Sequence, residues 1–177
     1  MLTASGGWRA PSDLVGRADE ISQLRLAYRT ASEARCTVMA NVSGQSGMGK
    51  TALVRFFLDE VIEGDDETIV LEGRCYENES VPYKALDSLV DDLSTYMEAL
   101  PQTEVSDWLS ECDVEALTRI FPVLERVDAV SDAVARELTR GDTQQIRRKA
   151  FAALRHILKL LTDSRPVVCF VDDVQWG

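Results

Sequence analysis

Apolar residues along the chain follow two patterns, one typical of helices and one typical of buried strands. Apolar positions three or four residues apart predict helices at about 20–28, 52–62, 83–100 and 143–162. Short continuous apolar runs predict three strands, at 36–42, 67–73 and 167–171. Between 103 and 140 the pattern predicts two or three short helices, broken near Pro122 and at Gly141.

This alternation of strands and helices predicts an α/β fold built on one parallel sheet. Residues 1–12 are polar and contain glycine, and we expect them to be flexible ahead of a single domain at 13–177. The helices predicted at 76–165 lie between the second and third strands. We therefore expect helices on both faces of the sheet and a large helical insertion, whose last helix is capped by Asp142 or Thr143.

A glycine-rich segment separates the first predicted strand from the helix that follows it. It fits the phosphate-binding pattern G-x-x-x-x-G-K-[ST], in which backbone N–H groups surround an anion at a helix N-terminus. Lys50 would contact β- and γ-phosphate oxygens and stabilise the transition state, and Thr51 would complete the shell of a Mg²⁺ ion. A glycine turn that only caps a helix would not explain the Lys-Thr pair. The predicted phosphate-binding residues are Gly44, Gln45, Ser46, Gly47, Met48, Gly49, Lys50 and Thr51.

Asp172 and Asp173 directly follow the third predicted strand. Open α/β sheets bind their ligands at the carboxyl ends of strands, which is where this pair lies. Because Mg²⁺ prefers oxygen ligands, Asp172 is the candidate metal ligand, and Asp173 is the candidate that orients or deprotonates the attacking water. Two acids at a strand end are by themselves more often solvated. The glycine-rich segment upstream favours the catalytic role.

The chain has 19 Lys and Arg against 30 Asp and Glu, which gives a net charge of −11. This excess of acids argues against direct binding of nucleic acid or anionic membranes by this segment. The basic run at 147–149 is expected to be a solvated helix face that pairs with acids. No apolar run approaches the length of a membrane span, and the N-terminus lacks the apolar core of a signal peptide.

The four cysteines are dispersed, with no C-x-x-C pair that would indicate a metal site. We expect all four to be small buried hydrophobic residues in a reducing cytoplasm: Cys36, Cys75, Cys112 and Cys169. His156 has no second histidine or cysteine nearby, so we expect it to pack on its helix rather than bind a metal.

Four segments of the chain together resemble a known family. They are Leu14-Val15-Gly16-Arg17, the glycine-rich loop, the stretch from Gly73 to Lys84, and the closing segment from Val171 to Gly177. Over residues 13–177 they are similar to the AAA-like ATPase domains of the signal-transduction P-loop NTPases of the STAND type. The resemblance implies ATP and Mg²⁺ as cofactors. It also implies an adenine pocket bordered by Val15, Gly16 and Arg17.

The same resemblance implies a parallel sheet of strand order 5-1-4-3-2, in which the fourth strand lies between the strand before the P-loop and the strand before Asp172. This sequence stops after the third strand. A sheet without its central strand leaves backbone N–H and C=O groups unpaired. We therefore expect an N-terminal fragment that is marginally stable or aggregates when expressed alone.

For the function, the resemblance implies slow Mg²⁺-dependent ATP hydrolysis in the full-length protein, as the nucleotide switch of a multidomain bacterial signalling or transcription regulator. Such a protein would be cytoplasmic and would bind ATP and ADP. It would contact protein partners, or itself, through C-terminal regions absent here. One alternative is a scaffold that holds nucleotide without turnover, and the intact Asp172-Asp173 pair favours hydrolysis over it. A small-molecule kinase would need an acceptor pocket and a lid, for which the acidic insertion has no arginine cluster.

Overall fold

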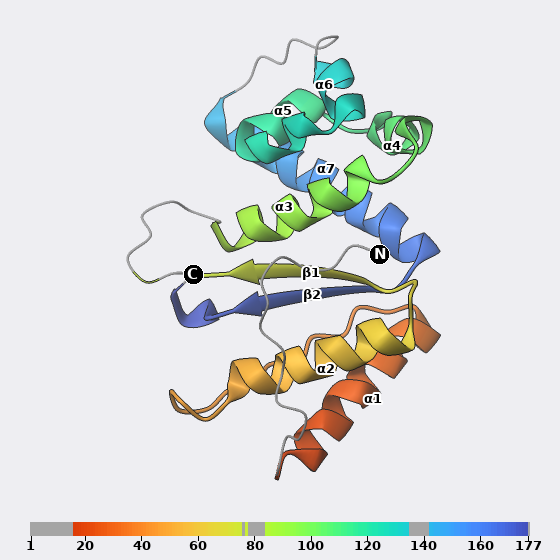
Figure 1. Cartoon of the computed structure of the whole chain (residues 1–177). Helices are drawn as coiled ribbons and strands as arrows, with labels where there is room; N and C mark the ends of the chain where they lie inside the picture. Colours follow the sequence, from red (N-terminus) through yellow and green to blue (C-terminus); the bar gives the residue numbers. More distant parts are fainter. Residues whose placement is uncertain (1–15, 76, 78–83, 135–141, 177) are drawn as a thin grey trace. The chain divides into compact units, whose positions relative to one another are not determined.

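The computed structural model describes residues 16–75, 77, 84–134 and 142–176 (Figure 1). The chain divides into two compact units, residues 1–70 and 71–177, and each is described by itself. The predicted flexible residues 1–12 and the base-site candidate Val15 lie outside the described residues. None of the described helices is long and apolar enough to cross a membrane.

The first unit contains two helices that pack on each other, α1 (Ala18–Ala34) and α2 (Lys50–Gly64). Arg25 of α1 donates to both carboxylate oxygens of Glu60 of α2, at 2.8 Å each. The rings of Tyr28 and Phe57 meet edge to face, with centroids 6.3 Å apart. Both helices confirm the sequence prediction, and their apolar spacing places these side chains in the buried part of the unit: Ile21, Leu53, Val54, Phe57, Leu58 and Val61.

The segment 36–42 forms no strand, so the strand predicted there is wrong. An extended apolar run becomes a strand only when a neighbouring strand pairs with its N–H and C=O groups. Among the described residues the sheet has two strands, and this segment is not one of them. Its side chains are accordingly uncovered, with Val38 39% and Met39 91% exposed.

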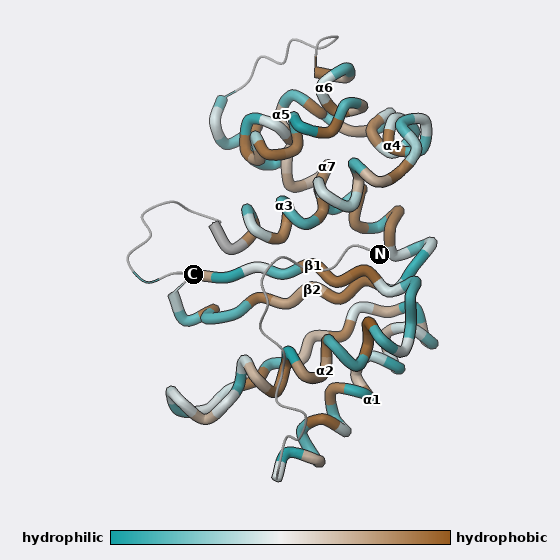
Figure 2. Tube along the Cα trace, in the orientation of Figure 1, coloured by the Kyte–Doolittle hydropathy of each residue, from teal (hydrophilic) through white to brown (hydrophobic). Residues whose placement is uncertain are grey.

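The sheet consists of two neighbouring parallel strands, β1 (Ile69–Arg74) and β2 (Val167–Asp172) (Figure 1). Both were predicted from their apolar runs, and β1 begins in the last residues of the first unit. Along both strands the colour changes from brown to teal toward the carboxyl end (Figure 2). Polar residues therefore gather where the two strands finish.

The second unit contains the remaining elements, which lie between β1 and β2 in the chain or follow β2. They are α3 (Lys84–Glu98), α4 (Gln102–Leu109), α5 (Val114–Ile120), η1 (Pro122–Arg126), α6 (Asp128–Val134), α7 (Thr143–Ser164) and η2 (Val174–Trp176). The predicted long helices correspond to α3 and α7, and the predicted cap Asp142 accepts a hydrogen bond of 2.8 Å from the Gln145 N–H. The broken region divides at Pro122, as predicted, into the short helices α4, α5 and α6 and the 3-10 turn η1.

The core of the second unit lies between the helices α3 to α7. The largest pairings are of α5 with α7, α4 with α6, and α3 with η1. Phe121, which is fully buried, meets the ring of Phe151 edge to face at 5.9 Å between centroids. Asp113 caps α5 and also pairs with Lys149 at 2.7 Å, so one member of the basic run does pair with an acid. That these helices form an insertion, and that helices cover both faces of the sheet, stay predictions.

The cysteine prediction is half right. Cys75 and Cys112 are buried free thiols, as expected, whereas Cys36 and Cys169 are exposed. Cys36 belongs to the run that forms no strand, and Cys169 lies on β2, none of whose residues is fully buried. An apolar run predicts burial only if something covers it.

Candidate functional site

The glycine-rich segment forms the turn that leads into α2. Gly47 and Gly49 both have φ of 79°, in the left-handed region that glycine adopts without strain. A Cβ at either position would meet nothing within 4 Å, so backbone conformation rather than crowding requires glycine here. The N-cap of α2 is Gly49, which brings no side chain to accept from the first N–H groups of the helix. These groups, at the positive end of the helix dipole, suit an anion such as phosphate.

Lys50 is the first residue of α2, and its side chain folds back over the turn. Its ammonium group donates to the carbonyl oxygens of Gly44, at 3.0 Å, and Gln45, at 3.1 Å. Met48 N–H donates to the Gln45 carbonyl at 3.4 Å, which closes the turn. The structure thus brings the predicted residues 44–51 together as one loop and helix start, with Lys50 facing the loop.

Arg17 adds a contact to this loop that sequence reasoning did not predict. Its guanidinium donates to the Met48 carbonyl oxygen at 3.0 Å and to the Glu20 carboxylate at 2.7 Å. The hydrogen bond from Arg17 lowers the pKa of Glu20 from its ordinary value. Gly16, just before it, has φ of 78°. Two of the three base-site candidates, Gly16 and Arg17, therefore lie at the start of α1, and Arg17 reaches the glycine-rich loop.

Asp172 and Asp173 stand at the carboxyl end of β2, in the second unit. Asp173 has φ of 55°, a left-handed conformation that aspartate tolerates better than most residues. Its N–H donates to Asp172 Oδ1 at 3.0 Å. Its carboxylate accepts from Arg74 Nε at 3.1 Å and Nη2 at 2.9 Å, both on Oδ2, and from Gln175 Nε2 on Oδ1 at 3.2 Å. The adjacent acids thus differ in surroundings, and the Asp173 carboxylate is held by neighbouring side chains.

Arg74 is the residue of this group that sequence reasoning missed. It ends β1, the strand beside β2, and the sequence signals for it were its place directly after the second predicted strand and within the segment from Gly73 to Lys84 that carries the family resemblance. The pairing of β1 with β2, which brings Arg74 to Asp173 across 99 positions of sequence, cannot be read from either run by itself.

Each of the two predicted magnesium ligands carries an oxygen donor, Thr51 in the first unit and Asp172 in the second. The hydroxyl of Thr51 and the carboxylate of Asp172 are hard oxygen donors of the kind that Mg²⁺ prefers. Within the described part of the chain, no group of three or more His, Cys, Asp or Glu side chains gathers as a metal site. Mg²⁺ is typically bound by one or two carboxylates together with substrate phosphates and water, so a single acid suits it.

Comparison with known proteins identifies the family. Residues 13–177, all but the first twelve, match the profile of the AAA ATPase domain. The chain belongs to the AAA ATPase domain family. This chain is also similar to the ORC1-type DNA replication protein 2 of Haloarcula marismortui, with 28% identity over 142 residues. That similarity covers 75% of this chain and 34% of the relative, so the chain spans about a third of the relative's length. No solved structure gives a significant match.

Membership of the AAA ATPase domain family indicates ATP binding and hydrolysis as the chemistry of the domain. The small parallel sheet, with a P-loop sequence at the start of a helix, agrees with such a fold. The finer assignment to the STAND type, and the individual roles of the residues above, stay proposals.

Proposed function

We propose that this AAA ATPase domain binds ATP with Mg²⁺ and hydrolyses it slowly, as the nucleotide switch of a multidomain bacterial regulator of the STAND type. The observation that carries the proposal is the start of α2. There, glycines with positive φ, a glycine N-cap and the Lys50 ammonium form a turn that would suit a phosphate, in a chain of this family.

Phosphate binding would use the N–H groups of the turn and the first residues of α2. Gly44 to Gly49 supply the loop, and Lys50 supplies a positive charge for the β- and γ-phosphate oxygens. Thr51 and Asp172 would hold the magnesium ion, which neutralises charge on the phosphates when bound. Val15, Gly16 and Arg17 are proposed for the adenine side, on the family resemblance.

Asp173 would orient or deprotonate the water that attacks the γ-phosphate. The proposal is supported by its place at the carboxyl end of β2 and by a carboxylate whose two oxygens have defined partners. A carboxylate fixed in this way loses little conformational freedom when the reaction begins, which is what a catalytic group requires.

The regulatory part of the proposal concerns what nucleotide turnover controls. In switch proteins, contacts to the γ-phosphate hold one conformation, and hydrolysis releases it. We propose that this domain works in the same way in the cytoplasm, with ATP and ADP as its ligands and with protein partners or self-association as its output. The rival proposal is a scaffold that holds nucleotide without turnover.

The similarity to an ORC1-type DNA replication protein raises a role at DNA as a second candidate. The net charge of −11 argues against direct DNA contact by this segment, because acids repel phosphates. The similar region also covers only a third of that relative, so its other regions have no counterpart in the match.

The deciding experiment measures nucleotide binding and phosphate release by the full-length protein. Asp173→Asn is the informative variant, because asparagine also tolerates positive φ and so removes the charge without straining the backbone. We expect it to bind ATP normally and to lose turnover by about 100-fold or more, as for loss of a general base. Lys50→Ala should weaken nucleotide binding itself.

The matched control is Asp66→Asn, which removes an equal charge from an exposed position of the first unit. It should leave binding and turnover at wild-type values. Equal rates of phosphate release in wild type and Asp173→Asn would contradict hydrolysis through Asp173. If both bind ATP tightly without turnover, the scaffold proposal stands.

A further inference from the structure

Three cations lie on the outward side of α7. Arg148, Arg155 and Lys159 are all exposed, and their spacings of seven and four residues place them on one face of the helix. No other described residue forms an ion pair with any of the three, which we call the basic face. The buried residues of α7 lie on the opposite side of the helix: Ala150, Ala153, Leu154, Ile157 and Leu161. The basic face therefore points away from the core of the second unit.

A row of carboxylates lies on the outward side of α4. Glu104 and Asp107 are exposed, whereas Val105 and Leu109 of the same helix are buried. Glu111, in the turn that follows α4, is exposed as well and continues the helical spacing. Among the described residues none of these three acids has an ion-pair partner. We call them the acidic face.

The two faces do not neutralise each other within one copy of the chain. α4 and α7 pack on each other, and each face points away from the buried residues of its own helix. Lys149, next to the basic face in sequence, shows the contrast, because it reaches Asp113 and pairs with it at 2.7 Å. The charges of both faces are therefore available to a partner.

We propose that the basic face of one copy of this chain binds the acidic face of a second copy. Arg148 and Arg155 are seven positions apart, as are Glu104 and Glu111, so the charges of the two faces have similar spacing. Seven residues of helix extend over about 10 Å, which is long enough to distinguish one register from another. Complementary charges of this kind steer the encounter of two proteins and fix their register.

The number of cations favours a protein partner over a nucleic acid. Proteins that bind duplex DNA neutralise about six to ten phosphates, and the basic face offers three cations. The chain has a net charge of −11, which repels a densely charged polyanion. A second copy instead supplies a short row of carboxylates whose spacing matches that of the cations.

Association through these faces should be weak and sensitive to salt. Exposed ion pairs contribute little one by one, and salt screens them. The net charge of −11 on each copy opposes the contact, but repulsion between charges more than about 8 Å apart is largely screened at physiological ionic strength. We therefore expect reversible association that weakens as NaCl is raised from about 0.05 to about 0.5 M.

The test is sedimentation velocity of the full-length protein over a concentration series, without nucleotide, so that the result does not depend on ATP hydrolysis. Arg155→Glu and Asp107→Lys each place like charges opposite each other, and each should weaken association by at least about 10-fold. Arg29→Glu is the matched control, because it makes the same charge change at an exposed position of α1. It should associate as wild type does.

Mixing the two variants gives the sharper result. Arg155→Glu keeps an intact acidic face and Asp107→Lys keeps an intact basic face, so an equal mixture should associate like wild type although neither variant does so by itself. Variants that fail to fold would not recover on mixing. A wild-type protein that stays monomeric, charge reversals without effect, or a mixture that does not associate would each overturn the proposal.

A fluorescent duplex DNA tests the other class of partner. Its anisotropy should not change with wild-type protein at physiological salt. If the DNA binds, and Arg155→Glu abolishes that binding but leaves association of the copies unchanged, the basic face serves nucleic acid and the proposal is wrong.

Discussion

Asp92 of α3 accepts a hydrogen bond of 2.8 Å from the backbone N–H of Glu72 in β1. This N–H lies on the edge of β1 that faces away from β2, since successive N–H groups of a strand point to opposite sides and Cys75 N–H bonds toward β2. Burial raises the pKa of Asp92, and the hydrogen bond from Glu72 opposes that increase. The Asp92 side chain thus supplies an acceptor to an N–H group on this edge of β1.

Two substitutions of Asp92 should distinguish the contribution of its hydrogen-bond acceptor to stability from the contribution of its charge. Asp92→Ala leaves the Glu72 N–H without this acceptor, which costs about 1–3 kcal/mol in the free energy of unfolding. Asp92→Asn keeps an acceptor oxygen and should retain most of the stability. Urea unfolding of both variants measures the difference.

The charge of Asp92 gives a pH dependence with a defined sign. Because its folded pKa is raised, its contribution to stability is greatest below the ordinary aspartate pKa and is lost as the pH rises through the raised value. Wild type should therefore lose stability relative to Asp92→Asn over that rise in pH. If the free energies of unfolding of wild type and Asp92→Asn differ by the same amount across that pH range, burial does not raise the pKa of Asp92.

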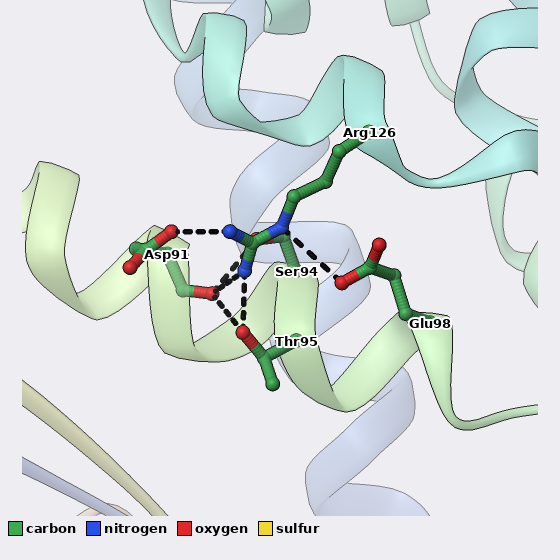
Figure 3. A network of polar contacts seen from close by, with 5 residues as sticks. All are labelled: Asp91, Ser94, Thr95, Glu98 and Arg126. Atoms are coloured by element: carbon green, nitrogen blue, oxygen red, sulfur yellow. Dashed lines mark hydrogen bonds and ion pairs between the residues drawn. The ribbon is translucent and has the colours of Figure 1, made fainter. Parts of the chain in front are cut away.

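Arg126 of η1 makes several polar contacts with α3. The guanidinium of Arg126 donates to the Asp91 carboxylate at 2.8 Å and to the Asp91 carbonyl oxygen at 2.7 Å (Figure 3). It also contacts the Thr95 hydroxyl and pairs with Glu98 at 3.3 Å. The Arg126 side chain thus contacts two turns of α3. These contacts connect α3 with η1, which lies later in the sequence.

Removing this arginine should loosen η1 without unfolding the helices. We expect Arg126→Ala to lower the free energy of unfolding by about 1 kcal/mol, toward the upper end for exposed ion pairs. Arg119→Ala is the control, because Arg119 pairs with Glu115 of the same helix, α5, rather than with another element. Hydrogen exchange should accelerate at 122–126 in Arg126→Ala only. Equal effects of the two substitutions would contradict the joining role.

Across the chain, the sequence predicts contacts that are local and misses those that depend on distant neighbours. Helices α2, α3 and α7 were predictable because their apolar spacing and the cap at Asp142 lie within a few residues of each other. The segment 36–42 has an equally apolar sequence, but a strand also needs a partner to pair with. The residues of the glycine-rich loop could be proposed from the sequence because their motif is continuous. Arg74 was missed because only strand pairing brings it to Asp173.

The exposure of the four free thiols should appear as different rates of alkylation. Cys36 is exposed and should react first, and Cys169 second, because desolvation raises its thiol pKa although the residue is exposed. Burial raises the pKa of Cys112 to about 11, which leaves about one thiolate in a thousand at pH 8. Cys112 and the buried Cys75 should react last.

A short pulse of iodoacetamide followed by mass spectrometry of the peptides gives this order. In denaturant all four should react at similar rates, which serves as the control. Labelling of Cys112 as fast as Cys36 in the folded protein would contradict the packing of the α4–α5 connection against α7, because the Cys112 thiol lies 3.9 Å from the Ala153 carbonyl oxygen of α7.

The two hydrogen bonds of Lys50 to its own loop affect how nucleotide affinity is to be understood. The ammonium already has acceptors in the carbonyl oxygens of Gly44 and Gln45. In the proposed phosphate site, an arriving phosphate would displace these two carbonyl oxygens from the ammonium, so the binding free energy would measure an exchange of partners rather than the strength of one contact. After the product dissociates, the carbonyl oxygens of Gly44 and Gln45 can again accept hydrogen bonds from the Lys50 ammonium. If the loop binds phosphate as proposed, its affinity for nucleotide depends on the carbonyl groups of Gly44 and Gln45 as well as on Lys50.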